Sequence, residues 1–390
     1  MSANRRIALL LAVCVTGCAS TVPLDHAVVA YDLTTAESVQ EQLLLNIARA
    51  RNNQPIHFTA VSSITATYRL TTNAGIGPAV TGNRGGLIVP LLGASAESSP
   101  TISITPMQGD EFTQRLLTPF REGQLTLLLR QGYDVDSLLR LLGAEIHLDH
   151  EGGGDTIHNN RPSDREGYQL YRRIVAHLSS IQDRHSLYVE PLHFTHTWNV
   201  PESAVTPETY SATYKDFTIE HDEAAHVYRI SKRINGRVMI TNYDPDILSN
   251  DERLRLHGKA EEAPFNDVLI DIRAGQVGGE YPIHGRLRLR SLHEVLTFVG
   301  RGMGEEPEFD VPPDPRTPPI TENPATTLQI SETAGAPAGA VSVRLGGHYY
   351  AVAPQSGYQW NQKTFSLLYQ LFQMSVSSVS APGPSITIAK

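Results

Sequence analysis

The amino-acid sequence predicts an α+β protein of two or three small domains, in which amphipathic helices pack on short antiparallel sheets. Three observations predict this class. Apolar residues recur at spacings of three and four in several separate stretches, as on one face of a helix. Stretches of alternating apolar and polar residues lie between them, as in half-buried strands. One amphipathic helix with two or three strands recurs three times, an order typical of α+β domains.

The N-terminal part, residues 34–150, is expected to contain a helix, one long β-hairpin and a three-helix unit. Thr34 and Glu37 match a capping box at the start of the first helix. The hairpin is expected over 58–105, where two extended stretches flank a Gly-rich tract and one strand face is rich in hydroxyl groups. Apolar spacing then predicts three short helices, the last of which runs through Ile146.

The Gly-rich run 151–164 has the composition of a linker and is expected to be a domain boundary. A middle α+β domain is expected over 163–300, and its first helix is expected to open with a capping box of Ser163 and Glu166. The strongest hairpin signal is Asn235-Gly236 between two alternating stretches, because this dipeptide favours a two-residue type I′ turn.

The C-terminal part begins with a Pro-rich loop at 304–337, which contains eight prolines and little apolar periodicity. We expect this loop to be extended or disordered and to bury little surface. Residues 338–390 are expected to form a hairpin, a helix and a last strand. The aromatic residues Tyr349, Tyr350 and Trp360 could line a glycan or peptide surface, but at these spacings they are expected to fill cross-strand pairs.

The first residues have the pattern of a secretory signal. Arg5 and Arg6 precede a short apolar run at 7–15, which ends in the tetrapeptide Val15-Thr16-Gly17-Cys18. This run is too short to span a bilayer, which needs about 20 apolar residues, and is typical of a signal peptide. The tetrapeptide resembles the lipobox of bacterial lipoprotein precursors, in which an aliphatic residue and two small residues precede an obligatory cysteine.

This resemblance implies that residues 1–17 are a signal peptide removed before Cys18. It implies that Cys18 is the lipidation site, with a diacylglycerol on its thiol and an acyl group, such as palmitate, on the new amino terminus. Residues 18–33 would then be a lipidated tether. Ala19 stands where lipoproteins retained in the inner membrane usually carry Asp, so the resemblance implies the periplasmic face of the outer membrane.

Composition and motifs exclude several other classes. The formal net charge of −9 is dispersed without a Lys/Arg block, so no nucleic-acid partner is expected. Cys14 would leave with the signal peptide and Cys18 would carry lipid, which excludes disulfides, thiolate catalysis and Cys-zinc sites. No phosphate loop, dinucleotide fingerprint or nucleophile elbow is found. We therefore predict no catalytic residue and no cofactor, although a carboxylate pair would leave no trace in the sequence.

The fifteen histidines do not predict a metal site either, because none of them forms an H-E-x-x-H motif. In a strand, residues three apart point to opposite faces, which is poor geometry for two ligands of one metal. Solvated or capped histidines are expected instead. The closely spaced pairs are His147 and His150, His193 and His196, and His221 and His226.

These observations predict a lipid-anchored periplasmic protein that serves as a non-catalytic assembly or binding subunit of an envelope complex, through an envelope protein partner or self-association. Three stretches, LLLNIARARNNQPIHF, SITPMQGDEF and KTFSLLYQLF, are also similar to uncharacterised proteobacterial lipoproteins, which adds no mechanism. Two alternatives remain open. One is an oligomeric outer-membrane pore formed by the 58–105 hairpin, because bilayer-spanning strands need about 9–11 alternating residues. The other is a cell-wall or polysaccharide hydrolase that uses an unrecognised acid pair.

Overall fold

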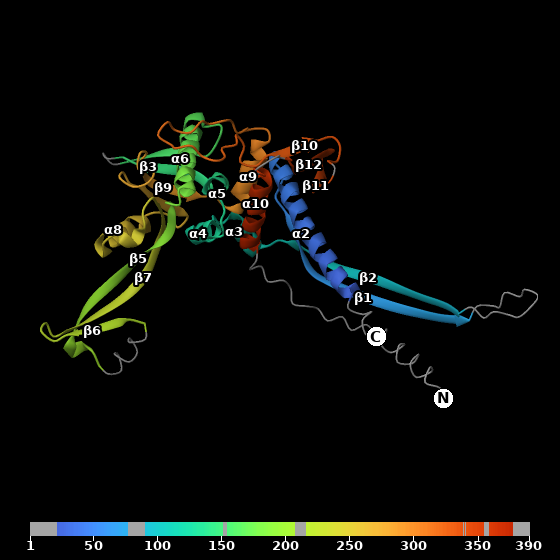
Figure 1. The fold of residues 1–390 in the computed structure, drawn as a ribbon, viewed down its shortest axis with the longest axis horizontal. Coiled ribbons are helices and arrows are strands. Elements are labelled where there is room, and N and C mark those ends of the chain that lie inside the picture. The colour runs from blue at the N-terminus through green and yellow to red at the C-terminus, as the bar shows by residue number, and fades with distance from the viewer. Residues whose placement is uncertain are drawn as a thin grey trace, which may run out of the picture. The chain divides into compact units, whose positions relative to one another are not determined.

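The computed structural model describes residues 22–76, 90–150, 154–206, 216–337, 339, 341–354 and 359–376. These residues form helices and small, mainly antiparallel sheets, which agrees with the predicted α+β class (Figure 1). The chain divides into two compact units, one that contains the residues up to Leu43 and His57–Phe112, the other made of Leu44–Ile56 and Thr113–Ser377. None of the described helices is long and apolar enough to cross a membrane.

The helices have the following bounds, together with the short 3-10 helices η1 (Glu202–Ala204) and η2 (Pro245–Ile247). They are α2 (Val22–Arg51), α3 (Asp110–Leu117), α4 (Glu122–Arg130), α5 (Val135–Leu142), α6 (Arg165–Asp183), α8 (Asn250–Glu261), α9 (Leu292–Gly302) and α10 (Trp360–Val376). Apolar spacing explains most of them. In α6, for example, the predicted stripe Tyr171, Ile174, Val175, Leu178 and Ile181 is fully buried.

The first unit contains the strands β1 (Phe58–Ile76) and β2 (Pro90–Met107), which pair antiparallel along their whole length. The register runs from Phe58 opposite Met107 to Ile76 opposite Pro90. At the Phe58 end, the buried Phe58 ring packs edge-on against Phe112 with 6.3 Å between ring centroids. The Gln42 side-chain oxygen of α2 accepts a hydrogen bond from the Thr59 amide at 2.7 Å. These contacts fix this end of the strand pair to α2.

The predicted start of the first helix at Thr34 is wrong, because α2 already begins at Val22. Pro23 lies in the first turn, where its missing N–H leaves no hydrogen bond unmade. The Thr34 hydroxyl does not cap the helix but donates to the Ala30 carbonyl one turn earlier, at 2.8 Å. A capping-box pattern inside a helix thus gave a false start.

The second unit is built around a seven-stranded sheet with the order β4-β3-β9-β8-β7-β5, and β6 pairs with β7 outside this path. All neighbouring strands are antiparallel except β7 and β8, which are parallel. The strands are β3 (Gly143–Asp149), β4 (Asp155–Asn159), β5 (Tyr188–Pro201), β6 (Thr218–Asp222), β7 (Val227–Thr241), β8 (Asp267–Ile272) and β9 (Ile283–Leu289). Helix α8 covers part of one sheet face, where its Ala260 packs on Leu192, Met239 and Leu269.

A smaller sheet near the C-terminus has the order β10-β12-β11, formed by β10 (Ile330–Thr333), β11 (Ser342–Leu345) and β12 (His348–Val352). Gly346 and Gly347 connect β11 to β12 with φ angles of +58° and +93°, as a tight hairpin turn requires. This predicted hairpin is confirmed. The last predicted strand, residues 385–389, lies outside the described residues.

The predicted turn at Asn235-Gly236 is wrong, because β7 runs through it without interruption. Its partner β5 instead has an irregularity between Pro191 and His193. A Cβ atom on Gly236 would lie 2.9 Å from both His257 Nδ1 and Phe194 Cε1. Glycine at this position therefore lets α8 and β5 pack closely against the strand. It does not form a turn.

Two boundaries also differ from those expected around residue 150. The third helix of the N-terminal part ends at Leu142, and Ile146 lies in β3. Strands β3 and β4 pair with each other, so the sheet continues across the boundary expected at 151–164. The N-cap of α6 is Asp164 and not Ser163, since the Asp164 carboxylate accepts from the Gly167 amide. A Gly-rich run between two short strands therefore resembled a linker in composition.

The Pro-rich loop is extended, without a helix or strand before β10, and it packs on buried arginines of α5 and α6. Arg140 and Arg172 each donate to the Pro324 carbonyl at 2.8 Å. The loop buries Val311, Thr327 and Leu328. The expectation that it buries little surface is wrong, because guanidinium groups satisfy the carbonyl oxygens of a segment that has few N–H groups of its own.

Candidate interaction surface

The outer part of the β5–β7 pair projects from the rest of the second unit and ends in a three-stranded sheet with β6 (Figure 1). We call residues 195–201, 216–222 and 227–233 the arm. In its register Trp198 lies opposite Ile230, which lies opposite Ile219 on the other side. Since alternate residues of a strand point to opposite faces, the register assigns every arm side chain to one of two faces.

One face of the arm carries aromatic and apolar side chains, and we call it the aromatic face. The Trp198 ring lies 4.3 Å from the His196 ring and 5.9 Å from the Phe217 ring. The His221 and Tyr228 rings stack at 4.6 Å. Trp198 is 41% exposed, which is unusual for so large an apolar residue. The aromatic face comprises His196, Trp198, Val200, Phe217, Ile219, His221, Tyr228, Ile230 and Lys232.

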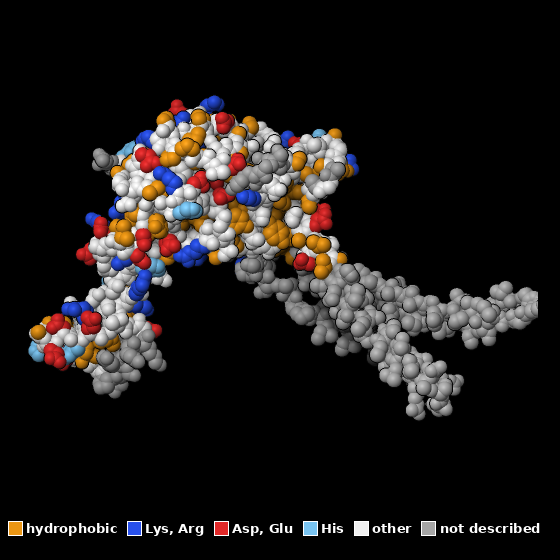
Figure 2. All heavy atoms as spheres, in the orientation of Figure 1, with side chains coloured by type: hydrophobic (Ala, Val, Ile, Leu, Met, Phe, Trp, Pro, Cys, Tyr) orange, Lys and Arg blue, Asp and Glu red, His pale blue; other side chains and the backbone are white. Residues whose placement is uncertain are grey.

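The opposite face of the arm is polar. Arg229 forms exposed ion pairs there with Asp222 at 3.4 Å and Glu220 at 3.8 Å. Exposed pairs of this kind contribute little to stability, typically under about 1 kcal/mol. The space-filling view shows charged, histidine and hydrophobic side chains side by side at the end of the arm (Figure 2). The arm is thus an amphipathic sheet with one charged face and one aromatic face.

The edge of β5 is closed at the base of the arm by α8. The Asn250 side-chain amide accepts from the Thr195 amide at 2.7 Å and donates to the Thr195 carbonyl at 3.0 Å. The Asn250 side chain therefore makes the two hydrogen bonds with Thr195 that the backbone of a neighbouring strand would make. Beyond it the edge of β5 runs on to Pro201, which has no N–H to offer. An edge strand of this kind is a place where a further strand can pair.

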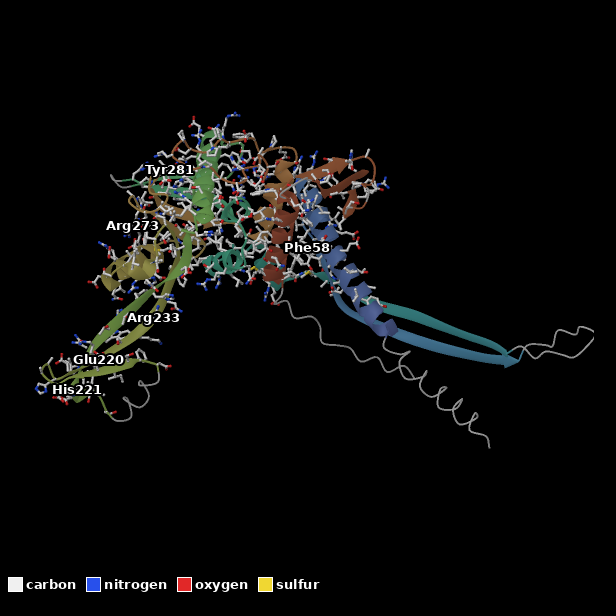
Figure 3. The ribbon with its side chains drawn as sticks, viewed as in Figure 1. Phe58, Glu220, His221, Arg233, Arg273 and Tyr281 are labelled. Atoms are coloured by element: carbon white, nitrogen blue, oxygen red, sulfur yellow. The ribbon has the colours of Figure 1, made fainter. Side chains whose placement is uncertain are left out.

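The end of the arm brings together His221 and His226, which the sequence had singled out. The two carboxylate oxygens of Glu202 lie 3.4 Å from His221 Nε2 and 3.4 Å from His226 Nδ1. Figure 3 shows His221 and Glu220 near the far end of the arm and Arg233 closer to the main sheet. Among the described residues, no group of three His, Cys, Asp or Glu side chains is arranged to hold a metal ion.

The other histidine pairs do not form sites. His193 contacts the Asn235 side chain at 2.9 Å, whereas His196 packs on Trp198, so the two point to opposite faces of β5 as expected. His147 lies in β3, where its Nε2 is 2.8 Å from Glu145. Sequence reasoning gave these histidines no functional role, and the geometry gives them structural contacts.

Two buried carboxylates of the second unit, Asp267 and Asp271, have cationic partners. Asp267 contacts Arg286 at 3.2 Å and Arg288 at 3.1 Å. Burial favours a higher pKa for Asp271, but hydrogen bonds from Tyr243 and Arg273 outweigh it and lower the pKa. Carboxylates held in this way by cations and hydroxyl donors are typical of structural ion pairs. They do not favour the hydrolase alternative.

One buried acid differs from these. Burial raises the pKa of Asp136 to about 6, although the nearby Arg140 opposes the shift. Asp136 lies in the first turn of α5, where its carboxylate accepts from the Ser137 amide at 2.7 Å. A raised pKa is one mark of a catalytic acid, but Asp136 is only 3% exposed and lines neither the cavity of about 330 Å³ beside α9 nor the cavity of about 300 Å³ beside Lys259. Its buried carboxyl instead makes the stability of the fold depend on pH.

Sequence reasoning missed the arm as a unit because residues 195–224, which include the outer half of β5 and all of β6, have the composition of a polar loop. Two signals were present. Apolar Phe217 and Ile219 alternate with polar residues from Asp216 to Glu220, and Ser249 with Glu252 forms the capping box that opens α8. Of the aromatic residues singled out near the C-terminus, Tyr350 and Trp360 are in the core, each 2% exposed. Tyr349 is half-buried and lies opposite Thr333 and Arg344 in the small sheet.

Cys18, the one residue with a chemical assignment from the sequence, lies outside the described residues. Comparison with protein-family models, with curated proteins and with solved structures gives no match for this chain. Its function therefore has to be argued from its own residues, and the arm is the described surface best suited to bind another molecule.

Proposed function

We propose that this chain is a lipid-anchored periplasmic protein, a non-catalytic binding or assembly subunit of an envelope complex, and that the aromatic face of the arm contacts its partner. The observation that carries this proposal is the exposed Trp198 on a projecting sheet. Tryptophan and tyrosine are enriched among the residues that dominate binding energy at protein interfaces. On the same face, Phe217, Ile219 and Ile230 are half-buried, so Trp198 is its most exposed large apolar side chain among the described residues. An exposed aromatic side chain on an apolar surface is typical of such interfaces.

The geometry of the aromatic face supports tight binding without a large entropic cost. His196 and Phe217 hold the Trp198 ring from two sides, at 4.3 Å and 5.9 Å. The strands on which they lie fix the backbone. Side chains that are already ordered lose little conformational freedom on binding, so more of the contact energy becomes affinity. Beyond Thr195, β5 is an edge strand of the described sheet, so it would add main-chain hydrogen bonds if the partner supplied a strand.

The lipobox at residues 15–18 supports the anchor. A diacylglycerol and a third acyl chain on Cys18 would hold the protein stably, because a single acyl chain gives only marginal membrane binding. Replacing Cys18 by Ser should abolish incorporation of radiolabelled palmitate and release the protein from the outer-membrane fraction. Unchanged labelling and unchanged fractionation of Cys18→Ser would refute the anchor.

Affinity purification of the full-length protein from detergent-solubilised envelopes tests the role of the arm. We expect a discrete species of higher mass with one reproducible partner, identified by mass spectrometry. Trp198→Ala should reduce partner recovery at least tenfold, because loss of a central aromatic contact costs roughly 2 kcal/mol or more. Phe265→Ala is the matched control, since Phe265 is a 53% exposed aromatic residue outside the arm.

The result is read from both variants together. Loss of the partner in Trp198→Ala and retention in Phe265→Ala would support the arm as the contact surface. Equal recovery in both variants would move the contact elsewhere. A strictly monomeric wild-type protein that captures no envelope partner would overturn the proposal as a whole.

A second candidate function is an oligomeric outer-membrane pore formed by β1 and β2. The observation that favours it is the length of the pair, 19 and 18 residues, which exceeds the roughly 9–11 residues that span a bilayer. Protease protection of residues 75–86 in native outer membranes would support the pore. Full cleavage of the same residues by protease supplied from the periplasmic side would exclude it.

A further inference from the structure

A cavity of about 330 Å³ lies in the second unit, between α9 and the ends of β3 and β4. It is distant in sequence from the arm and plays no part in the proposed contact. Its size suits a molecule of roughly ten heavy atoms, since a water molecule occupies about 30 Å³ of liquid. The lining residues are Ala144, Glu145, Asn159, Asn160, Arg161, Arg290, His293, Glu294, Thr297, Phe298, Arg301 and Glu306.

Three carboxylates of the lining already have partners. Glu306 accepts from Arg161 at 3.1 Å, and Glu145 pairs with Arg288 at 2.7 Å. Glu294 caps the start of α9 and accepts from the Ser291 amide at 2.7 Å. Each of these carboxylates already accepts a hydrogen bond or ion pair from the protein. Their negative charges would repel a ligand that carries more than one negative charge.

The Arg290 guanidinium also has partners within the protein. Its guanidinium donates to the Asn160 carbonyl at 2.6 Å and to the Leu141 carbonyl at 3.1 Å, and it lies 4.0 Å from the centre of the Phe298 ring. This stacking holds Phe298 in the wall of the cavity. The cavity therefore has an apolar surface, formed by Phe298 and Ala144, beside its polar groups.

Arg301 is different, because its guanidinium makes no ion pair or side-chain hydrogen bond to any described residue. Its Nε atom is shielded from solvent and has no acceptor. His293, Thr297 and Arg301 follow one another at intervals of four along α9 and all line the cavity, so they share one face of the helix. A shielded donor without an acceptor is unfavourable, and a ligand that supplies an acceptor removes this cost.

We propose that this cavity binds a small organic carboxylate, held by the Arg301 guanidinium at its charged end and by Phe298 along its apolar part. The planar guanidinium can donate two parallel hydrogen bonds to a carboxylate. The glutamates in the same wall oppose a second negative charge, so a monoanion is favoured over a phosphate dianion. The assignment is independent of the proposed function of the arm.

The same chemistry has two sources, a free short-chain acid or the C-terminal carboxylate of a peptide. Butyrate is the probe for a free acid, and N-acetyl-alanyl-alanine is the probe for a peptide C-terminus. The same peptide with a C-terminal amide is the control, because it differs mainly in lacking the negative charge. Inorganic phosphate tests the preference for a monocarboxylate. Calorimetric titration of the full-length protein in detergent micelles measures all four probes under the same conditions.

We expect at least one carboxylate probe to bind, and the tighter of the two identifies the source. The peptide amide should bind at least tenfold more weakly than the peptide acid. Arg301→Gln should weaken the bound carboxylate at least tenfold, as expected when hydrogen bonds to a charged group are lost. Arg130→Gln is the matched control, because Arg130 is likewise the basic residue in the last turn of its helix and is exposed.

Arg301→Lys keeps the charge and guards against misfolding of the Gln variant. It should fold like the wild type and bind a few-fold more weakly, since an ammonium lacks the planar pair of donors. The proposal is overturned if neither carboxylate binds, if the peptide amide binds as well as the acid, or if phosphate binds more tightly. It is also overturned if Arg301→Gln and Arg130→Gln bind alike.

Discussion

The two tryptophans of the chain lie in opposite environments. Trp360 begins α10 and is 2% exposed, its indole N–H donates to the Thr327 carbonyl at 2.8 Å, and the Arg140 guanidinium lies 5.0 Å from its ring centre. Trp198 lies on the arm and is 41% exposed, with His196 and Phe217 as its ring neighbours. The same side chain therefore completes a core in one region and presents a surface in the other.

The difference shows where the molecule has apolar surface left for a partner. Around Trp360 the chain supplies the acceptor for the indole and the cation over its ring, so nothing remains to be buried by another molecule. Around Trp198 the neighbours orient the ring but leave much of it in water. Removal of Trp360 should therefore affect folding, and removal of Trp198 should affect binding.

The largest expected effect is the loss of Trp360. Trp360→Ala should lower the free energy of unfolding by about 3–5 kcal/mol, because it opens a cavity and leaves the Thr327 carbonyl without its donor. Urea unfolding of the full-length protein in micelles measures this change. A loss below about 1 kcal/mol would mean that the region around α10 is not the packed core described here.

The second effect is a pH dependence caused by Asp136, beside the same Arg140 that covers Trp360. The folded pKa is about 6 and the ordinary value is 3.8, so between these values the folded state holds a proton that the unfolded state has released. The free energy of unfolding must therefore fall as pH rises through this window, by about 3 kcal/mol in total.

Comparison with Asp136→Asn isolates this contribution from those of the other acids. The stability of the wild type minus that of the variant should decrease between pH 4 and pH 7 and stay constant above pH 7. Urea unfolding at each pH provides both values. A difference that does not change with pH would show that Asp136 ionises as easily in the folded state as in the unfolded one.

The helical part of this core was predictable from the sequence because its signals are local. In α6 the apolar residues recur three and four positions apart, and the S-x-x-E pattern of Ser291 and Glu294 predicts the capping box that opens α9. The clustering of Arg140, Arg172 and Pro324 was not predictable. Arg140 and Arg172 each donate to the carbonyl of Pro324, which lies more than 150 positions away in the sequence. No local sequence pattern indicates which carbonyl a buried guanidinium will bond to.

The arm was missed for a related reason. Asn235-Gly236 has the local preference of a turn, but α8 and β5 pack against Gly236 and keep the strand extended. Tertiary contacts thus decided between two conformations that the dipeptide permits. Once β7 is continuous, Trp198 and Phe217 come from separate strands to one face, which no single stretch of sequence could indicate.

Gly236→Ala tests this explanation and should have the third largest effect. The added Cβ would lie 2.9 Å from His257 and Phe194, so we expect a loss of about 1–3 kcal/mol from overpacking. Gly123→Ala in α4 is the control, because no atom lies within 4 Å of its added Cβ and alanine favours a helix. The control should be neutral or more stable by up to about 1 kcal/mol. Equal effects in urea unfolding would contradict the close approach of α8 and β5.

The smallest expected effect on stability is that of Trp198→Ala. Among the described residues the ring has two aromatic neighbours, and it is 41% exposed, so its loss should cost about 1 kcal/mol or less. Acrylamide quenching of tryptophan fluorescence should show one accessible and one protected component in the wild type. Trp198→Ala should lose the accessible component and keep the protected one, which belongs to Trp360. A large loss of stability, or protection of both tryptophans in the isolated protein, would mean that the aromatic face is already covered and not available to a partner.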